Sequence, residues 1–251
     1  MGRLIAAEFQ KLFATRLWLV LLVGSVGISV LYASLAIAFA DSPGNPTPPL
    51  STKEGQGTVF ATAQGASTLV AVLGAIGLTG EFRHKTATAT FLATPKRGRI
   101  VIAKLITYCV VGIGYAIVCF AAVAAVAVPW LSAKGVTVVM EGKFAIFVGV
   151  VASIAIFAAV GVGLGALLRD QVATVVGLLI YLFIVEPILT RVTALESWTK
   201  YLPGAAEDAL TQVTQSNQHL LAPTLGGVVL LAYGVLFAVA GTFLAMRRDI
   251  T

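Results

Sequence analysis

The sequence predicts an all-α, polytopic membrane protein with six transmembrane helices in a single domain, residues 1–251. Hydrophobic residues make up 58% of the chain and charged residues only 11%, and the mean hydropathy is +0.95. No ordinary soluble domain has this composition. Apolar runs long enough to cross a bilayer, roughly 20 residues as helix, recur along the chain. A helix also satisfies its own backbone hydrogen bonds in lipid.

The predicted spans are six apolar segments, residues 17–40, 59–79, 105–131, 144–168, 172–189 and 225–246. Glu186 and Pro187 interrupt the far end of the fifth segment, which predicts a tilt or a break there. The first segment is longer than the apolar part of a secretory signal, and no clear small-residue cleavage site follows it. We therefore expect it to remain as the first span.

Residues 1–16 form a predicted amphipathic helix ahead of the first span. Its apolar side carries Leu4, Ile5, Phe9, Leu12 and Phe13, and its polar side carries Arg3, Gln10, Lys11 and Thr15. Such a helix lies in the headgroup plane with its cations toward anionic lipid. A cap that stabilises the first span is an equally good interpretation of the same pattern.

The distribution of basic residues predicts the orientation of the chain in the lipid bilayer. With the N-terminus inside, 12 of the 17 Lys and Arg residues fall inside and 5 fall outside. This asymmetry favours both termini in the cytoplasm. The basic residues behind the net charge of +6 are divided among the loops that flank the spans. We therefore interpret this charge as the signal that orients the spans in the membrane. We therefore expect no binding of nucleic acid.

The most polar segment on the predicted cytoplasmic side is residues 80–104, GEFRHKTATATFLATPKRGRIVIAK, between the second and third spans. Glu81 can pair with Lys85 across one helical turn. Pro95 ends any short helix that contains Phe91 and Leu92. Such a helix could dock on a soluble partner and transmit a push from it, while a loop that only sets the topology is the alternative.

Two segments are predicted outside the membrane on the other side. Residues 41–57 are rich in proline and form a connector. Residues 190–224 contain two predicted short helices, residues 194–201 and 205–214, separated by a break at Pro203 and Gly204. A structural lid on the outer membrane surface is favoured over a ligand site for this extracellular segment.

Glycine and cysteine within the spans predict packing. Gly161 and Gly165 match the GxxxG pattern of close helix contacts, and tight packing within one subunit is favoured over a dimer face. Cys109 and Cys119 lie ten residues apart on different faces of the third span, so they cannot pair with each other. Neither cysteine has the spacing of a metal site.

The sequence argues against an enzyme. It contains no GxxxxGK[ST], HExxH or GxSxG motif, and His84 and His219 fall on opposite sides of the predicted membrane. We therefore expect no cofactor and no metal in this chain. Its spans contain almost no ionisable residues apart from Glu186, which argues against an ion-coupled transporter. Glu186 is interpreted as an interfacial carboxylate, with contact to a substrate as the alternative.

Several residues resemble the ABC-2 type permeases, the membrane subunits of bacterial ABC exporters. In the loop between the second and third spans these are Glu81, Arg83, Thr86, Leu92, Pro95, Arg97, Arg99 and Lys104, and ahead of the first span they are Glu8, Lys11 and Trp18. The runs TFLATP and RGR are most similar to short actinobacterial members. The six-span plan matches as well, so the resemblance covers essentially the whole chain.

The resemblance implies a permease subunit in the bacterial plasma membrane. It would pair with a second copy or a homologous permease and with two ATP-binding cassette ATPase subunits, which would bind the ATP and Mg²⁺. Its cargo would be a hydrophobic or amphipathic compound, such as a drug, an antibiotic or a lipid-linked molecule, moved outward by alternating access. The implied ATPase-coupling loop contains Glu81, Arg83, Lys85, Thr86, Phe91, Leu92, Pro95, Arg97 and Arg99.

The same resemblance places the second and fifth spans around the substrate path. The residues offered there are Thr62, Gln64, Ser67, Thr68, Tyr181 and Glu186. Gln64, Ser67 and Thr68 share one helical face, which turns away from acyl chains for interhelical hydrogen bonding or to line the path. Two other functions remain open: a membrane anchor or assembly factor that does not transport, and an ion-coupled secondary transporter.

Overall fold

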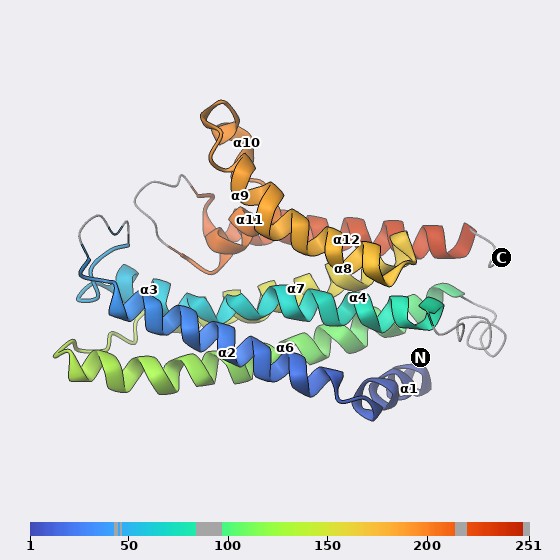
Figure 1. Ribbon diagram of the computed structural model, residues 1–251, viewed down its shortest axis with the longest axis horizontal. Helices are drawn as coiled ribbons and strands as arrows, with labels where there is room; N and C mark the ends of the chain where they lie inside the picture. The colour runs from blue at the N-terminus through green and yellow to red at the C-terminus, as the bar shows by residue number, and fades with distance from the viewer. Residues whose placement is uncertain (43–44, 46, 84–96, 214–219, 248–251) are drawn as a thin grey trace.

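The computed structural model describes residues 1–42, 45, 47–83, 97–213 and 220–247 (Figure 1). This part of the chain is helical and contains no strand. Its elements are α1 (Gly2–Ala14), α2 (Leu17–Ala38), α3 (Lys53–Ala61), the 3₁₀ turn η1 (Thr62–Ala66), α4 (Ser67–Arg83), α6 (Arg97–Ala133), α7 (Lys143–Leu168), α8 (Gln171–Ile180), the π turn η2 (Tyr181–Val185), α9 (Glu186–Leu189), the 3₁₀ turn η3 (Thr193–Leu195), α10 (Glu196–Thr199), α11 (Pro203–Leu210) and α12 (Pro223–Arg247).

Six helical stretches in the described part are long and apolar enough to cross a membrane. They are Leu17–Ala38, Lys53–Arg83, Gly98–Ala133, Lys143–Leu168, Gln171–Leu189 and Pro223–Phe243. Each coincides with one of the six predicted segments. The all-helical fold class and the number of candidate spans therefore agree with the prediction.

The long helices run along the longest axis of the molecule (Figure 1). Helix α1 and the last turns of α12 lie at one end of the bundle, which we call the terminal end. Helix α3 and the connection between α6 and α7 lie at the other end, the distal end. The two ends therefore expose different loops, as the two faces of a membrane require.

Helices α4 and α7 form the centre of the bundle, and glycines let them approach closely. A Cβ atom added at Gly161 would lie 1.9 Å from the carbonyl oxygen of Ala71, and one added at Gly74 would lie 2.6 Å from that of Ala158. Gly165 lies against Ala75 in the same contact. The predicted use of Gly161 and Gly165 for packing within one subunit is confirmed.

The outer surface of the bundle is apolar. Val20 on α2, Val172 on α8 and Val239 on α12 are each more than 60% exposed. A continuous apolar surface of this kind is unfavourable in water and favourable against acyl chains. The exterior is therefore that expected of a multi-pass membrane protein.

The second span begins earlier than predicted. The hydroxyl of Thr52 accepts a hydrogen bond of 3.1 Å from the backbone N–H of Gly55, so helix α3 starts at Lys53 inside the expected 41–57 connector. An N-cap threonine satisfies a backbone donor that otherwise has no partner. The span then passes through η1 before it continues as α4. The second span therefore covers Lys53–Arg83 and contains the predicted segment, residues 59–79.

The predicted loop over residues 80–104 is also shorter than expected. Helix α4 continues to Arg83, and α6 begins at Arg97, eight residues before the predicted start of the third span. Polar residues occupy these helix ends, so the apolar pattern did not extend to them. Residues 84–96 lie outside the described residues.

The fifth span stays continuous but changes to a π turn at the position where the sequence predicted a tilt or a break. The π turn η2 immediately precedes Glu186 and Pro187, because a proline inside a helix removes one backbone donor and displaces the preceding turn. The two short helices predicted within residues 190–224 are present as α10 and α11, but the break between them falls at residues 200–202, ahead of Pro203 and Gly204. Pro203 instead begins α11, since the first helical position needs no backbone N–H.

Candidate functional site

Helix α1 brings two charged residues to the terminal end of the bundle. Glu8 and Lys11 lie one turn apart on it, and Leu12 is buried beside them. Glu8 is only 4% exposed. The rings of Phe9 and Phe13 stack with centroids 6.1 Å apart. Leu12 and the half-buried Phe9 pack α1 on the bundle and carry the Glu8 carboxylate inward, whereas Phe13 is exposed.

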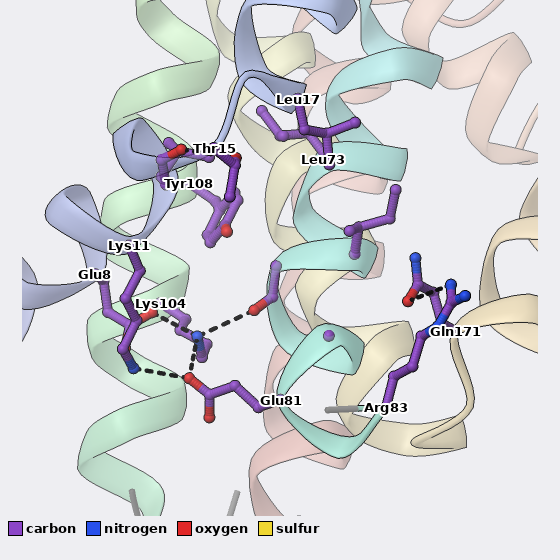
Figure 2. A pocket seen from close by; sticks show the side chains of 14 residues that line it. Glu8, Lys11, Thr15, Leu17, Leu73, Glu81, Arg83, Lys104, Tyr108 and Gln171 are labelled. Atoms are coloured by element: carbon purple, nitrogen blue, oxygen red, sulfur yellow. Dashed lines mark hydrogen bonds and ion pairs between the residues drawn. The ribbon is translucent and has the colours of Figure 1, made fainter. Parts of the chain in front are cut away.

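Four charged side chains meet there and form what we call the charge cluster: Glu8, Lys11, Glu81 and Lys104 (Figure 2). Lys104 Nζ lies 2.5 Å from Glu8 Oε2 and 2.9 Å from Glu81 Oε1. Lys11 Nζ lies 2.8 Å from an oxygen of each carboxylate. Lys104 Nζ also donates to the carbonyl oxygen of Gly77 at 3.1 Å. The cluster therefore joins α1, α4 and α6.

Two carboxylates and two ammonium groups make the charge cluster neutral. Lys104 is 1% exposed, so removal of its partners would leave a buried charge, which is strongly unfavourable. Burial lowers the pKa of Lys11, but its hydrogen bonds with Glu8 and Glu81 outweigh this effect and raise the pKa above its ordinary value. Lys11 therefore remains charged at neutral pH.

A cavity of about 530 Å³ opens beside the charge cluster. Leu17, Leu73 and Ile76 form part of its apolar wall. On the opposite side of the view in Figure 2, Arg83 Nη1 donates to Gln171 Oε1 at 3.3 Å and so connects α4 with α8. The cavity is thus bounded by four of the candidate spans and by α1.

Glycine makes the close contact at the cavity wall possible. A Cβ atom at Gly77 would lie 1.8 Å from the hydroxyl oxygen of Tyr108. Tyr108 lies on α6, and farther along that helix the hydroxyl of Tyr115 donates to the carbonyl oxygen of Trp18 at the start of α2. These contacts hold α2, α4 and α6 together beside the charge cluster. Trp18 and Glu8, two of the residues that carry the family resemblance, thus both contact α6.

The predicted coupling residues divide between the helix ends and the segment between them. Glu81 and Arg83 close α4, and Arg99 is exposed on the first turn of α6. Glu81 contacts Lys11 and Lys104, which the pairing expected with Lys85 did not anticipate. Arg97 begins α6. Lys85, Thr86, Phe91, Leu92 and Pro95 lie outside the described residues.

The predicted path residues lie on four elements, η1, α4, η2 and α9. Gln64 Nε2 donates to Asp208 Oδ1 at 2.7 Å, and the hydroxyl of Ser67 is hydrogen bonded to Glu207. Glu186 Oε1 accepts from the backbone N–H groups of Gly204 at 2.7 Å and Ala205 at 3.1 Å. Residues from the second and fifth spans therefore both contact α11.

The remaining path residues have local contacts. The hydroxyl of Thr62 donates to the carbonyl oxygen of Val59 at 2.7 Å. Thr68 is half-buried on α4, and Tyr181 is half-buried in the π turn η2. The structure therefore brings Gln64, Ser67 and Glu186 together around α11 and leaves Thr62 outside that group.

Sequence reasoning missed three features of these sites. It counted Lys104 as a loop cation, whereas Lys104 is buried in α6, one turn after the buried Ile100 and one turn before the buried Tyr108. It did not single out Glu207 and Asp208, which stand between alanines on α11. For Lys104 on α6 and for the acidic pair on α11, the sequence signal was a charged residue within an apolar stripe. Such a residue needs a partner from elsewhere in the chain.

The side chains of these sites are held by ion pairs and hydrogen bonds. No group of three or more His, Cys, Asp or Glu residues within the described part could hold a metal ion. Cys119 is buried and Cys109 is half-buried, and both are free thiols. Neither a scan against protein-family models nor a search of curated proteins found a match to this chain.

Proposed function

We propose that this chain is the permease subunit of an ATP-driven exporter of the ABC-2 type. The observation that carries the proposal is the charge cluster, because it connects both helix ends that flank residues 84–96 to helix α1. A permease of this kind receives its energy from a separate ATPase. It therefore needs a rigid connection between the surface that contacts the ATPase and the helices that move.

The charge cluster has the geometry of such a connection. Glu81 lies at the end of α4 and Lys104 lies two turns into α6, and their ion pair is 2.9 Å long. A force on the segment between these helices would act on both of them and on α1 together. Coupling between distant sites requires packed or bonded elements of this kind. The exposed cations Arg83 and Arg99 beside the segment suit an acidic surface on the partner.

The orientation follows from the distribution of basic residues. We assign the terminal end to the cytoplasm and the distal end to the outside of the bacterial plasma membrane. Helix α1 then lies at the cytoplasmic interface, where the ATPase subunits would also bind. ATP and Mg²⁺ belong to those subunits. A second copy of this chain, or a homologous permease, completes the assembly.

The proposed cargo is a hydrophobic or amphipathic compound that moves outward by alternating access. The path would run beside Thr62, Gln64, Ser67, Thr68, Tyr181 and Glu186, of which Gln64, Ser67 and Glu186 contact α11. The helices that would line it are predominantly apolar. Helix α11 would close the outer end of this path, in keeping with the lid expected for residues 190–224.

One observation favours a second candidate, an ion-coupled secondary transporter. Glu186 and Glu207 are buried, and Asp208 lies beside them on α11. Such carboxyl groups are typical of proton relays in transporters. This candidate requires no ATPase, so transport in its absence separates the two functions.

The test is purification of the chain from native membranes with identification of bound proteins by mass, followed by ATPase assays of the reconstituted complex. An exporter subunit is expected to co-purify with an ATP-binding cassette protein and to stimulate the ATP hydrolysis of that protein. Arg99→Glu should reduce this stimulation to near the rate of the ATPase alone. Arg191→Glu, an exposed cation after α9, is the control and should leave stimulation unchanged.

Two outcomes would reject the exporter, and a third would reject the proposed coupling surface. A chain that binds no ATPase, while its vesicles accumulate cargo only under an ion gradient, is a secondary transporter. A chain that binds other membrane proteins and moves nothing is an anchor or assembly factor. Equal ATPase stimulation by the Arg99→Glu and wild-type chains would show that the terminal end is not part of the coupling surface.

A further inference from the structure

Helix α11 is attached to the second span through carboxyl groups. Glu207 is hydrogen bonded to the hydroxyl of Ser67, and Asp208 accepts from Gln64 Nε2 at 2.7 Å. The hydroxyl of Thr211, just after the helix, donates to Gln64 Oε1. All three contacts fall on η1 and the first turn of α4. The attachment of α11 therefore depends on side chains whose hydrogen bonding changes with protonation.

These carboxyl groups have no basic partner in the described part of the chain. The ion pairs found there join Glu8, Asp41, Glu81 and Glu141 to lysines, and none reaches Glu186, Glu207 or Asp208. Glu207 is 9% exposed. An ionised carboxylate buried without a counter-charge is strongly unfavourable, so the group holds a proton instead.

The elements around α11 add further acidic groups. Glu186 on α9 interacts electrostatically with Glu207 and Asp208, and with Tyr181 in η2 and Tyr233 on α12. Helix α7 contributes the hydroxyl of Ser153 beside Glu207, while its charged residue, Lys143, interacts with Lys53 and Glu54 at its first turn. The surroundings of α11 therefore contain several acids.

Glu186 provides an independent observation that points to a proton among these acids. Its Oε1 atom accepts hydrogen bonds from the first turn of α11. Its Oε2 atom is buried and has no hydrogen-bond partner among the described residues, and the side chain as a whole is 5% exposed. A buried acceptor without a donor is unfavourable unless it carries or receives a proton.

We infer that Glu207 and Asp208 form a proton-binding site, and that loss of their protons releases α11 from the second span. In the protonated pair, neutral carboxyl groups remain hydrogen bonded to Ser67 and Gln64. When the protons leave to water, two negative charges face each other and Glu186 in a buried setting. Repulsion and the lack of a counter-charge then favour movement of α11 toward water.

The direction of the pH dependence follows from the two acids. Burial raises the pKa of Glu207 to about 8, with a further contribution from Asp208 and Glu186. Burial also raises the pKa of Asp208 to about 6. The attached state therefore binds protons more tightly than the released state, whose carboxyl groups have ordinary pKa values. Attachment is strongest at low pH and weakens as the pH rises toward about 8.

Hydrogen exchange of the peptide that contains residues 203–210 measures the attachment. The purified full chain in lipid nanodiscs is compared from pH 5.5 to pH 9, with rates corrected for intrinsic exchange. Between pH 6 and 8 the attached state keeps the proton of Glu207 that the released state has lost, so protection of α11 should fall by up to about tenfold per pH unit. Protection of α3 should stay constant over the same range.

Three variants locate the site. Glu207→Gln keeps a neutral hydrogen-bonding side chain and should remove the pH dependence between pH 6 and 8. Ser67→Ala removes a hydrogen bond that lowers the pKa of Glu207, so the midpoint should move to higher pH. Glu54→Gln changes an exposed carboxyl on α3 and is the control, with the wild-type response expected.

The inference is overturned if protection of α11 in the wild-type chain is constant from pH 6 to 9. It is also overturned if Glu207→Gln loses protection with the same pH dependence as the wild-type chain, or if Ser67→Ala leaves the midpoint unmoved. The Ser67→Ala variant retains the carboxyl groups and supplies this test even where Glu207→Gln does not fold. Because no ATPase or cargo is present, the result is independent of the proposed export function.

Discussion

Lys104 and Glu8 lie 96 residues apart in the sequence and form an ion pair of 2.5 Å at the terminal end of the bundle. Both side chains are almost completely buried. Neither would be stable there alone, because an isolated charge in a protein interior is strongly unfavourable. The position of α1 on the bundle therefore depends on this pair as well as on the apolar face of the helix.

Lys104→Met is expected to lower the free energy of unfolding by about 3–5 kcal/mol, because Glu8 and Glu81 then share one lysine, Lys11, and the buried cluster keeps an uncompensated negative charge. Equilibrium unfolding in mild detergent measures the change. Lys53→Met is the matched control. Lys53 pairs with Glu141 at 2.7 Å on the exposed surface, where the loss of an ion pair has little effect.

A double-mutant cycle adds a second check of the same pair. Glu8→Gln combined with Lys104→Met should be less unfavourable than the sum of the single changes, because the uncompensated charges are removed together. Strict additivity would show that the two residues do not stabilise the chain through each other.

Gly161→Ala is expected to destabilise the contact between α4 and α7. The new Cβ would lie 1.9 Å from the carbonyl oxygen of Ala71, so the two backbones must separate. Overpacking of this kind costs about 1–3 kcal/mol. Gly27→Ala on α2 is the control, since a Cβ there meets nothing within 4 Å. A melting temperature that falls equally in both variants would contradict the packing role.

The proposed orientation is tested by cysteine labelling of intact cells in a chain without Cys109 and Cys119. Lys53→Cys and Lys200→Cys should react with an impermeant reagent added outside. Lys96→Cys should react only after the membrane is permeabilised. Protection of the first two positions together with labelling of the third would reverse the assignment of the terminal end to the cytoplasm.

Local sequence patterns were sufficient for the candidate spans but not for their ends. The apolar run that begins at Leu17 predicts α2 because burial in lipid depends on composition alone. The starts of α3 at Lys53 and α6 at Arg97 depend on other effects. Thr52 caps the first of these helices, and the second extends beyond the apolar run through polar residues.

The candidate site required contacts that no local pattern contains. Glu8 falls on the apolar face of α1 between Leu4 and Leu12, which signals a buried charge but does not identify its partner. Lys104 becomes that partner only through the packing of α1 against α6. The same is true of Glu207, whose contact with Ser67 joins positions 140 residues apart.

The polar face of the second span gives the last prediction. Gln64, Ser67 and Thr68 were expected to make hydrogen bonds between helices or to line the substrate path. Gln64 does make such bonds, since its amide donates to Asp208 and accepts from Thr211. Gln64→Leu should therefore loosen α11 while the protein stays assembled, since each bond contributes about 0.6–2 kcal/mol.

Thr68→Val separates the two roles. Its hydroxyl makes no hydrogen bond to another side chain among the described residues, so the change should leave the melting temperature and the hydrogen exchange of α11 unaltered. If the face lines a translocation path, Thr68→Val alters the range of compounds exported by cells that carry it, because the hydroxyl would meet cargo directly. Wild-type export of every compound by Thr68→Val, together with faster exchange of α11 in Gln64→Leu, would assign this face to packing.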